Sequence, residues 1–251
     1  QIGSVEDVLS IDAGQGVLSN QQGKLQSTKD LSLKAQGIDN LSGLIATQAK
    51  LDLQQQWLNN NKGQMISGQS LNLAGRDFSN QGGLLQSGQD LNFKLSGKLD
   101  NSQSGQLISG GHTQIEASQL DNSQRGLINT QGDINITTQQ DINNAAGSIA
   151  AKNNVQLNSQ GLNNNKGQIG TEQGDLNIQT GQQALDNLAG QIQSGKTLTI
   201  KSNSLNNSGV ISALDTLELQ SQNKIDNDLG QIASNAQLNM TANQLSNQSG
   251  V

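Results

Sequence analysis

Apolar residues recur along this chain at a nearly constant interval. When the chain is aligned on an apolar residue that is followed two positions later by asparagine, twelve starts appear, 20 to 23 residues apart. The starts are Leu18, Ile38, Leu58, Phe78, Leu99, Leu120, Ile142, Leu162, Leu185, Leu205, Ile225 and Leu245. A period of this length without cumulative drift is typical of repeat architectures. The pattern therefore predicts about a dozen equivalent structural units.

Within each unit, apolar residues alternate with polar ones. A glycine follows the asparagine by two to four residues, an aliphatic residue lies two positions beyond it, and a small residue two positions further on. A second alternating pair comes later, as in Leu31 and Leu33. A period of two indicates short strands with one face turned inward. Between them, Gly, Asn, Asp, Ser and Gln supply the conformations that corners need.

A single unit cannot bury its apolar residues, whereas stacked units place like residues above one another. The sequence therefore predicts an all-β, right-handed parallel β-helix of about 11–12 coils, with about 20 residues and three short strands per coil. The right hand follows the usual chirality of parallel crossovers. With strands about 4.8 Å apart, a dozen coils give a rod of about 55 Å. We expect one β-helix domain over residues 1–251, with a partial coil at 1–17 and regular repeats at 18–251.

Other solenoids fit the pattern less well. Leucine-rich repeats need Leu-x-Leu-x-x-Asn-x-Leu, whereas here Leu-x-Leu is followed by a turn and then by Leu-x-Asn. Calcium-binding glycine-rich nonapeptides are absent from the sequence. Helical repeats conflict with the period of two and with the density of Gly and Asn.

One asparagine holds the same phase in every unit, which predicts a ladder of side-chain amides, each bond contributing about 1 kcal/mol. The predicted ladder comprises Asn20, Asn40, Asn60, Asn80, Asn101, Asn122, Asn144, Asn164, Asn187, Asn207, Asn227 and Asn247. The glycine column is expected at a corner where φ is positive or where no Cβ fits. Thr113 occupies a core position that other units fill with Leu, Ile or Val.

Composition alone points to a disordered Gln/Asn-rich chain, because only 31% of residues are hydrophobic and 1% aromatic. The regular apolar spacing argues against disorder. Net charge is −6 with scattered Lys and Arg, so no nucleic-acid partner is expected. No apolar run approaches the length of a transmembrane segment. Cysteine is absent, which is compatible with either redox compartment.

The repeat units resemble a known family. Residues 99–101 (Leu-Asp-Asn) followed by 105–110 (Gly-Gln-Leu-Ile-Ser-Gly), and the unit Leu-Asp-Asn-Leu-Ala-Gly-Gln-Ile-Gln-Ser-Gly-Lys-Thr-Leu-Thr-Ile at 185–200, closely resemble the haemagglutinin repeats of filamentous haemagglutinin and of CdiA-type contact-dependent growth inhibition proteins. The resemblance extends from Leu18 to the end of the sequence.

This resemblance implies a shaft segment of a large fibre that Gram-negative bacteria export by two-partner secretion. The implied partners are an outer-membrane transporter and, through the parent protein, a target-cell receptor or host surface. Residues 1–9 show no signal-peptide pattern, so we expect a fragment of a longer fibre. As an alternative, the irregular units from Leu99 to Ala184, including Glu172 and Gln173, form a lateral receptor- or glycan-binding module.

Candidate chemistry is sparse, and neither catalytic residues nor cofactors are predicted. One histidine and no cysteine argue against a His/Cys metal site. Acids recur after the first apolar residue of several units, as in Asp100 and Asp121, and are expected to cap turns at a solvated corner. The candidate surface-binding residues are Trp57, Arg76 and His112, and Trp57 is expected to share an aromatic neighbourhood with Phe78, Phe93 and Arg76.

Overall fold

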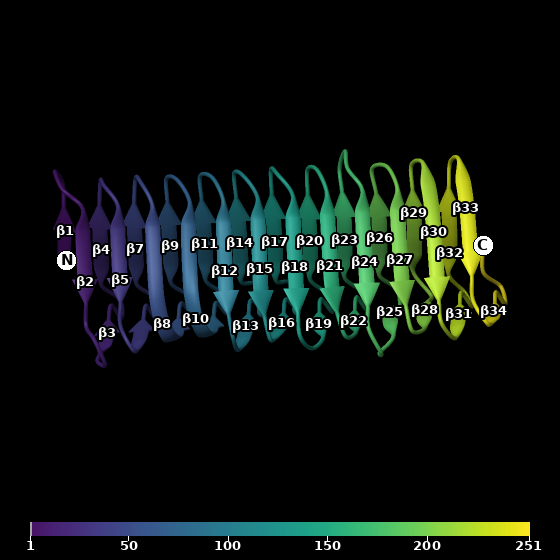
Figure 1. The fold of residues 1–251 in the computed structure, drawn as a ribbon, viewed down its shortest axis with the longest axis horizontal. Coiled ribbons are helices and arrows are strands. Elements are labelled where there is room, and N and C mark those ends of the chain that lie inside the picture. Colours follow the sequence, from purple (N-terminus) through teal and green to yellow (C-terminus); the bar gives the residue numbers. More distant parts are fainter. Residues whose placement is uncertain (1) are drawn as a thin grey trace.

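The computed structural model describes residues 2–251, which form 34 strands and no α-helix. Successive coils stack along one axis, so that the chain advances steadily from one end of the rod to the other (Figure 1). In Figure 1 the chain runs from left to right, the nearer strands descend and the fainter strands behind them ascend, so the winding is right-handed. The prediction of an all-β parallel solenoid is therefore confirmed.

The first strand of every coil belongs to one twelve-stranded parallel sheet, called here the first sheet. Its strands, in spatial order, are β1 (Ile2–Ser4), β4 (Lys24–Ser27), β7 (Leu44–Thr47), β9 (Gln64–Ser67), β11 (Leu84–Ser87), β14 (Gln106–Ser109), β17 (Leu127–Thr130), β20 (Ser148–Ala151), β23 (Gln168–Thr171), β26 (Gln191–Ser194), β29 (Val210–Ala213) and β32 (Gln231–Ser234).

The remaining strands form the other two sides of the coil. The second strands are β2 (Leu9–Asp12), β5 (Leu31–Lys34), β8 (Leu51–Asn59), β10 (Leu71–Ser79), β12 (Leu91–Leu95), β15 (Thr113–Ala117), β18 (Ile134–Thr138), β21 (Val155–Ser159), β24 (Leu176–Thr180), β27 (Leu198–Ser202), β30 (Thr216–Ser221) and β33 (Gln237–Thr241). The third strands are β3 (Val17–Ser19), β6 (Gly37–Asp39), β13 (Lys98–Asp100), β16 (Gln119–Asp121), β19 (Ile142–Asn143), β22 (Leu162–Asn163), β25 (Leu185–Asn187), β28 (Leu205–Asn207), β31 (Lys224–Asp226) and β34 (Gln244–Ser246).

Two coils depart from the predicted three strands. β8 and β10 each run for nine residues through the second corner, so the second and third strands are continuous there. Gly75 permits this, because a Cβ at that position would lie 2.0 Å from the carbonyl oxygen of Gln55. The missing side chain lets the two backbones stay paired where other coils bend.

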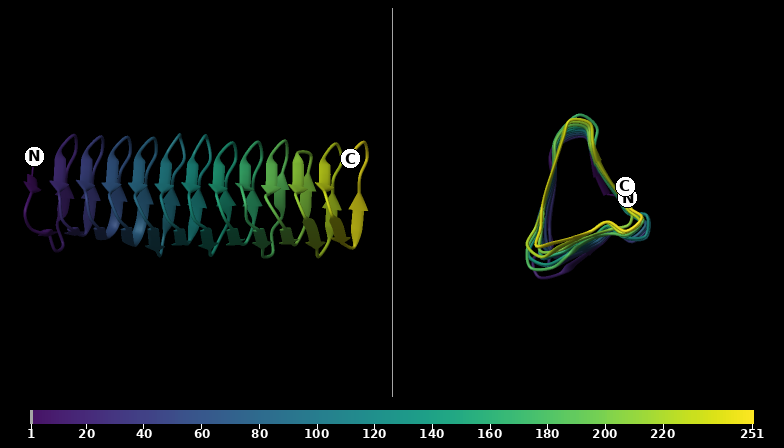
Figure 2. Two further views of the ribbon diagram at one scale, coloured as in Figure 1. Left: turned by 90° about the horizontal axis from the view of Figure 1, so that it is seen from above. Right: turned by 90° about the vertical axis from the view of Figure 1, so that its right-hand side faces the viewer.

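Seen end-on, the coils superimpose as a triangular outline (Figure 2). Register explains why they do so, because Leu51, Leu71 and Leu91 stand directly above one another. These side chains and their equivalents are buried in one continuous core. Each buried aliphatic side chain contributes about 1.5–3 kcal/mol.

Thr113 shows how a polar residue fits the core. It is 1% exposed and pairs with Leu91 and Ile134. Its hydroxyl oxygen lies 3.0 Å from Ser109 Oγ, which is in turn 2.7 Å from Thr130 Oγ1. This chain of hydroxyl groups satisfies the threonine within the apolar column.

Residues predicted as a partial coil already join the stack. β1 pairs in register with β4, and β2 pairs in register with β5. In the part of the chain that the structure describes, no helix is long and apolar enough to cross a membrane.

Candidate functional site: the amide ladder and a lateral depression

The twelve predicted asparagines stand in one column at the corner after the third strand. Each side-chain amide nitrogen donates to the amide oxygen of the next asparagine at 2.6–2.8 Å. The same nitrogen also donates to backbone carbonyls, as Asn40 does to Gln64 at 3.1 Å and to Gly43 at 3.2 Å. All donors point toward the carboxy-terminal end, so the ladder has a direction.

Glycine is needed beside the ladder because there is no room for a Cβ. A Cβ on Gly43 would lie 2.1 Å from the carbonyl oxygen of Asn20 and 2.5 Å from Asn40 Oδ1. The preceding residue, Ser42, carries the positive φ of 53°. Of the two explanations predicted for the glycine column, the steric one is confirmed and the positive-φ one is wrong. Positive φ falls instead on the residue before the glycine in eleven coils: Gln22, Ser42, Lys62, Gly82, Ser104, Arg125, Ala146, Lys166, Ala189, Leu229 and Ser249. In the two coils with a longer corner, Gln103 and Gln124 have positive φ as well.

The acidic column caps turns. Asp100 Oδ1 accepts hydrogen bonds from the amide and hydroxyl of Ser102, and Asp121 Oδ1 accepts one from the amide of Ser123. Lys98 Nζ bridges the two carboxylates at 3.1 and 3.3 Å. Burial opposes ionisation of Asp100, but the hydrogen bonds from Ser102 and Lys98 outweigh it and hold its pKa below the usual range.

The lysine is stabilised in its charged form in the same way. Burial alone would lower the pKa of Lys98, yet Asp100 and Asp121 together raise it above its ordinary value. A carboxylate whose charged form is stabilised by donors has no proton to give and is a weak base, so Asp100 is poorly suited to general acid–base catalysis. The hydrogen bonds and ion pairs of the cluster instead tie two coils together at this corner. Among residues 2–251, no three His, Cys, Asp or Glu side chains gather into a metal-binding group.

The structure does not bring Trp57, Arg76 and His112 together. Trp57 is 37% exposed, and its ring covers Gly37, where a Cβ would lie 2.1 Å from Cε2. Arg76 lies on the adjacent coil and forms an exposed ion pair with Asp77 at 2.8 Å. His112 precedes β15, at a different corner of the coil.

His112 belongs to a column of stacked corner residues in which each side chain accepts a hydrogen bond from a backbone amide of the next coil. Its amide donates to Asp90 Oδ1 at 2.9 Å, and its Nδ1 accepts from the amide of Asp133 at 3.1 Å. Asp133 Oδ1 accepts from the amide of Asn154, whose Oδ1 accepts from that of Asp175. The histidine therefore stabilises a corner in the same way as its acidic and amide counterparts.

The predicted aromatic neighbourhood is confirmed for Phe78 and Phe93 and wrong for Trp57 and Arg76. Phe78 and Phe93 are buried and stack inside the core, with centroids 5.7 Å apart and ring planes at 19°. Trp57 lies outside, because it precedes the inward-facing Leu58 by one position. Adjacent residues of a strand point to opposite faces.

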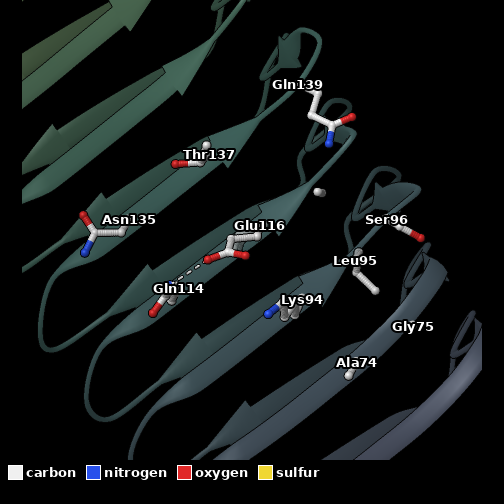
Figure 3. Close-up of a pocket in the computed structure, with 12 residues that line it drawn as sticks. Ala74, Gly75, Lys94, Leu95, Ser96, Gln114, Glu116, Asn135, Thr137 and Gln139 are labelled. Atoms are coloured by element: carbon white, nitrogen blue, oxygen red, sulfur yellow. Dashed lines mark hydrogen bonds between the residues drawn. The ribbon is translucent and has the colours of Figure 1, made fainter.

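A lateral depression lies on the outer face of the second strands, and sequence reasoning did not find it. It has a volume of about 550 Å³ and extends over four coils, with Ala74 and Gly75 at one end and Lys94, Gln114 and Glu116 in the middle (Figure 3). In register with Ala74, the neighbouring coils carry the longer Gln54 and Lys94. At this end of the depression one outward side chain is therefore reduced to a methyl group, while Gly75 is in register with the buried Gln55 and Leu95.

Gln55 adds an unusual polar group beside this depression. Its side chain is buried, at 5% exposure, and neither Nε2 nor Oε1 has a hydrogen-bond partner among residues 2–251. It lines a second cavity of about 420 Å³ that shares Ala74 and Gly75 with the first. A buried unpaired amide costs about 1–3 kcal/mol.

Comparison with known proteins identifies the repeat. The sequence signature of the haemagglutinin repeat matches residues 8–138, 108–182 and 171–249, which is nearly the whole chain. The chain belongs to the haemagglutinin repeat family. Neither the curated proteins nor the solved structures include a significant match.

Haemagglutinin repeats indicate a filamentous adhesin-type shaft that is secreted or exposed at the cell surface. The family also suggests a structural rather than an enzymatic protein. Residues 99–184 of this haemagglutinin repeat segment form coils with longer corners. One of these corners, directly after β23, carries the exposed Glu172 and Gln173. The depression extends over β10, β12, β15 and β18 and crosses the start of that irregular region.

Proposed function

We propose that this chain is a shaft segment of a large secreted, cell-surface fibre, either an adhesin or a CdiA-type toxin-delivery protein. The observation that carries the proposal is the amide ladder, which continues through every coil from Asn20 to Asn247. A column that repeats without interruption fixes the spacing of the coils. A segment built in this way holds a distal receptor-binding or toxin region at a set distance from the cell.

The same architecture suits export through an outer-membrane two-partner-secretion transporter, the proposed partner of the parent protein. The chain has no cysteine, so disulfides cannot form while it crosses an oxidising periplasm unfolded. Each completed coil offers the next one a strand edge and an amide column. Folding can therefore propagate along the rod as the chain emerges.

Whole-coil deletion in the full-length fibre tests the shaft function. Removing residues 38–77 excises two complete repeats and joins Gly37 to Phe78 in phase. We expect a filament shorter by about 10 Å, with export and target-cell adhesion retained, because a shaft supplies length and not contacts. Electron microscopy of the filament and an adhesion assay measure the two properties.

A matched deletion of residues 185–224 removes the same number of coils away from the depression. Both variants should behave alike if the segment is a shaft. Loss of adhesion in the 38–77 variant alone, with export intact, would contradict the shaft role.

Lateral binding is the second candidate, favoured by the depression and by the unpaired amide of Gln55. Ala74→Gln would narrow one end of the depression with the side chain that Gln54 carries one coil earlier. For a receptor- or glycan-binding face, we expect this variant to lose adhesion while keeping its β-type circular dichroism. Gln179→Ala, at the equivalent outward position of β24, serves as a control. Unchanged adhesion of the Ala74→Gln variant would exclude the depression as the binding face.

A further inference from the structure

The outer face of the first sheet differs from the rest of the surface in carrying a single charged residue, Lys24 of β4. The ten strands from β7 to β32 contain no Asp, Glu, Lys or Arg. The second strands, by contrast, carry outward charges at Lys34, Asp52, Lys94, Glu116, Lys201 and Glu218. In a chain with 34 charged residues, a neutral face of this length distinguishes one side of the rod.

Aliphatic side chains gather on this neutral face. They are partly exposed and lie at outward positions of five consecutive strands, β7 to β17: Leu44, Ile66, Leu84, Ile108 and Leu127. Gln64, Gln86 and Gln106 alternate with them. Beside the middle three strands, β9, β11 and β14, the corner carries Gly68, Gly88 and Gly110, stacked one over the next, so no side chain stands at that edge of the patch. Gln48 and Gln131 occupy the same corner position after β7 and β17.

The pattern on these five strands is symmetric about β11. Along one outward column the residues read Leu44, Gln64, Leu84, Gln106, Leu127. Along the other they read Ala46, Ile66, Gln86, Ile108, Asn129. A two-fold axis above β11, parallel to the strands, therefore sets aliphatic residues against aliphatic residues and amides against amides, except at the outermost pair, where Ala46 faces Asn129.

From this symmetry we infer that the first sheet binds the same sheet of a second copy, with the two rods antiparallel. Leu84 then faces its own equivalent, Ile66 faces Ile108 of the second copy, and Leu44 faces Leu127 of the second copy. A parallel arrangement would instead set Ile66 against Gln64 and Leu84 against Gln86. Flat β-sheets with interlocking amide and aliphatic side chains form dry contacts of this kind.

Size and charge are consistent with a second copy as the occupant. Nine strands, β1 to β23, overlap in this arrangement. Their footprint is about 43 Å by 13 Å, or about 1,100 Å² for the pair, just above the lower limit for a specific interface. Two chains of net charge −6 repel each other elsewhere, but the paired sheets bring together only neutral strands and Lys24.

This geometry has a consequence that rests on the proposed function. Shafts rooted in one surface run in the same direction, so an antiparallel pair joins shafts that project from opposing surfaces. A contact of this size is weak for one segment and gains strength when many shafts engage together.

A charge-swap experiment tests the antiparallel interface in solution. Sedimentation equilibrium of this chain should show a monomer–dimer equilibrium. Ile66→Lys and Ile108→Glu should each weaken the dimer by about 100-fold, because each buries an unpaired charge at two symmetry-related places. The double variant should dimerise within about threefold of the original, because each introduced lysine then faces an introduced glutamate.

Gln114→Lys, on the outer face of the second strands, should leave the dimer unchanged and serves as the control. Circular dichroism checks that every variant keeps its β structure. A monomer at all concentrations, equal dimerisation of all variants, or single variants that the double substitution does not rescue would each overturn the proposal. None of these results bears on whether the segment is a shaft, which the coil deletions test.

Discussion

Replacing Gly147 by alanine is expected to destabilise the solenoid by at least about 4 kcal/mol, as a steric clash with backbone that cannot move aside. The new Cβ would lie 1.9 Å from the carbonyl oxygen of Asn122 and 2.7 Å from Asn144 Oδ1. Relieving the clash requires two coils to separate, which opens the ladder between Asn122 and Asn144. Urea unfolding followed by circular dichroism measures the loss.

The adjacent residue provides a control of opposite character. Ala146 holds a φ of 54°, a conformation that costs L-residues about 1 kcal/mol and glycine almost nothing. Ala146→Gly relieves this cost in the folded chain but also gives the unfolded chain more conformational freedom, which opposes folding. The variant should therefore leave the stability unchanged or raise it by up to about 1 kcal/mol. If Gly147→Ala proves harmless, or if Ala146→Gly is the damaging change, the steric explanation of the glycine column is wrong.

The contrast between these two neighbours shows what the sequence could not supply. Glycine at a fixed phase predicts some backbone constraint, but two constraints were open and the sequence does not distinguish them. Positive φ falls on residues as different as Lys62, Leu229 and Ser249, which share no side-chain property. The steric constraint is visible only once Asn20 and Asn40 are seen to enclose Gly43 from two coils.

The sequence does predict which residues face the core, because alternate residues of a strand point to opposite faces. Phe78 occupies the same phase as Ile38 and Leu58, and Phe93 the same phase as Leu33, so the alignment itself places both rings inside. The prediction that Trp57 lies near Phe78 and Phe93 was wrong because it was based on residue type and not on position within the repeat unit. The charge-free strands can be read in the same way, but their symmetry about β11 depends on the register between coils.

The lateral depression could not be derived from phase alone. Ala74 and Gly75 look like ordinary strand residues in the sequence. Their effect depends on the longer Gln54 and Lys94 beside them and on the continuation of β10 through its corner. The buried amide of Gln55 likewise depends on this close backbone approach.

Asn122→Asp is expected to destabilise the rod by about 3–5 kcal/mol at neutral pH, because it places an unpaired charge in a buried ladder. Asn122 is 0% exposed. Its Oδ1 accepts from Asn101 Nδ2, and a carboxylate keeps that bond. Its Nδ2, however, donates to the oxygens of Asn144, Ser148 and Gly126, and the second carboxylate oxygen would face all three.

The pH dependence of this variant separates charge from shape. Burial among oxygens raises the pKa of the introduced carboxyl above its unfolded value of about 3.9. As the pH rises, the introduced carboxyl therefore ionises in the unfolded chain before it ionises in the folded one. The loss of folding stability is absent below about pH 4 and grows with pH until the folded carboxyl ionises too. Once protonated, the carboxyl can again donate a hydrogen bond to Asn144.

Unfolding in urea at pH 4 and pH 7 measures this effect, always as the difference from the unsubstituted chain at the same pH. That subtraction is needed because native carboxyls such as Asp100, whose pKa is lowered, themselves contribute stability that is lost in acid. Asn163→Asp, in the half-exposed acidic column beside the ladder, faces only the like charge of Asp186 and should lower stability by no more than about 1 kcal/mol at pH 7, and by less at pH 4. Equal destabilisation of the Asn122→Asp variant at both pH values would contradict this explanation. It would mean that the column depends on the shape of the amide group and that the hydrogen bonds of the ladder do not contribute to stability.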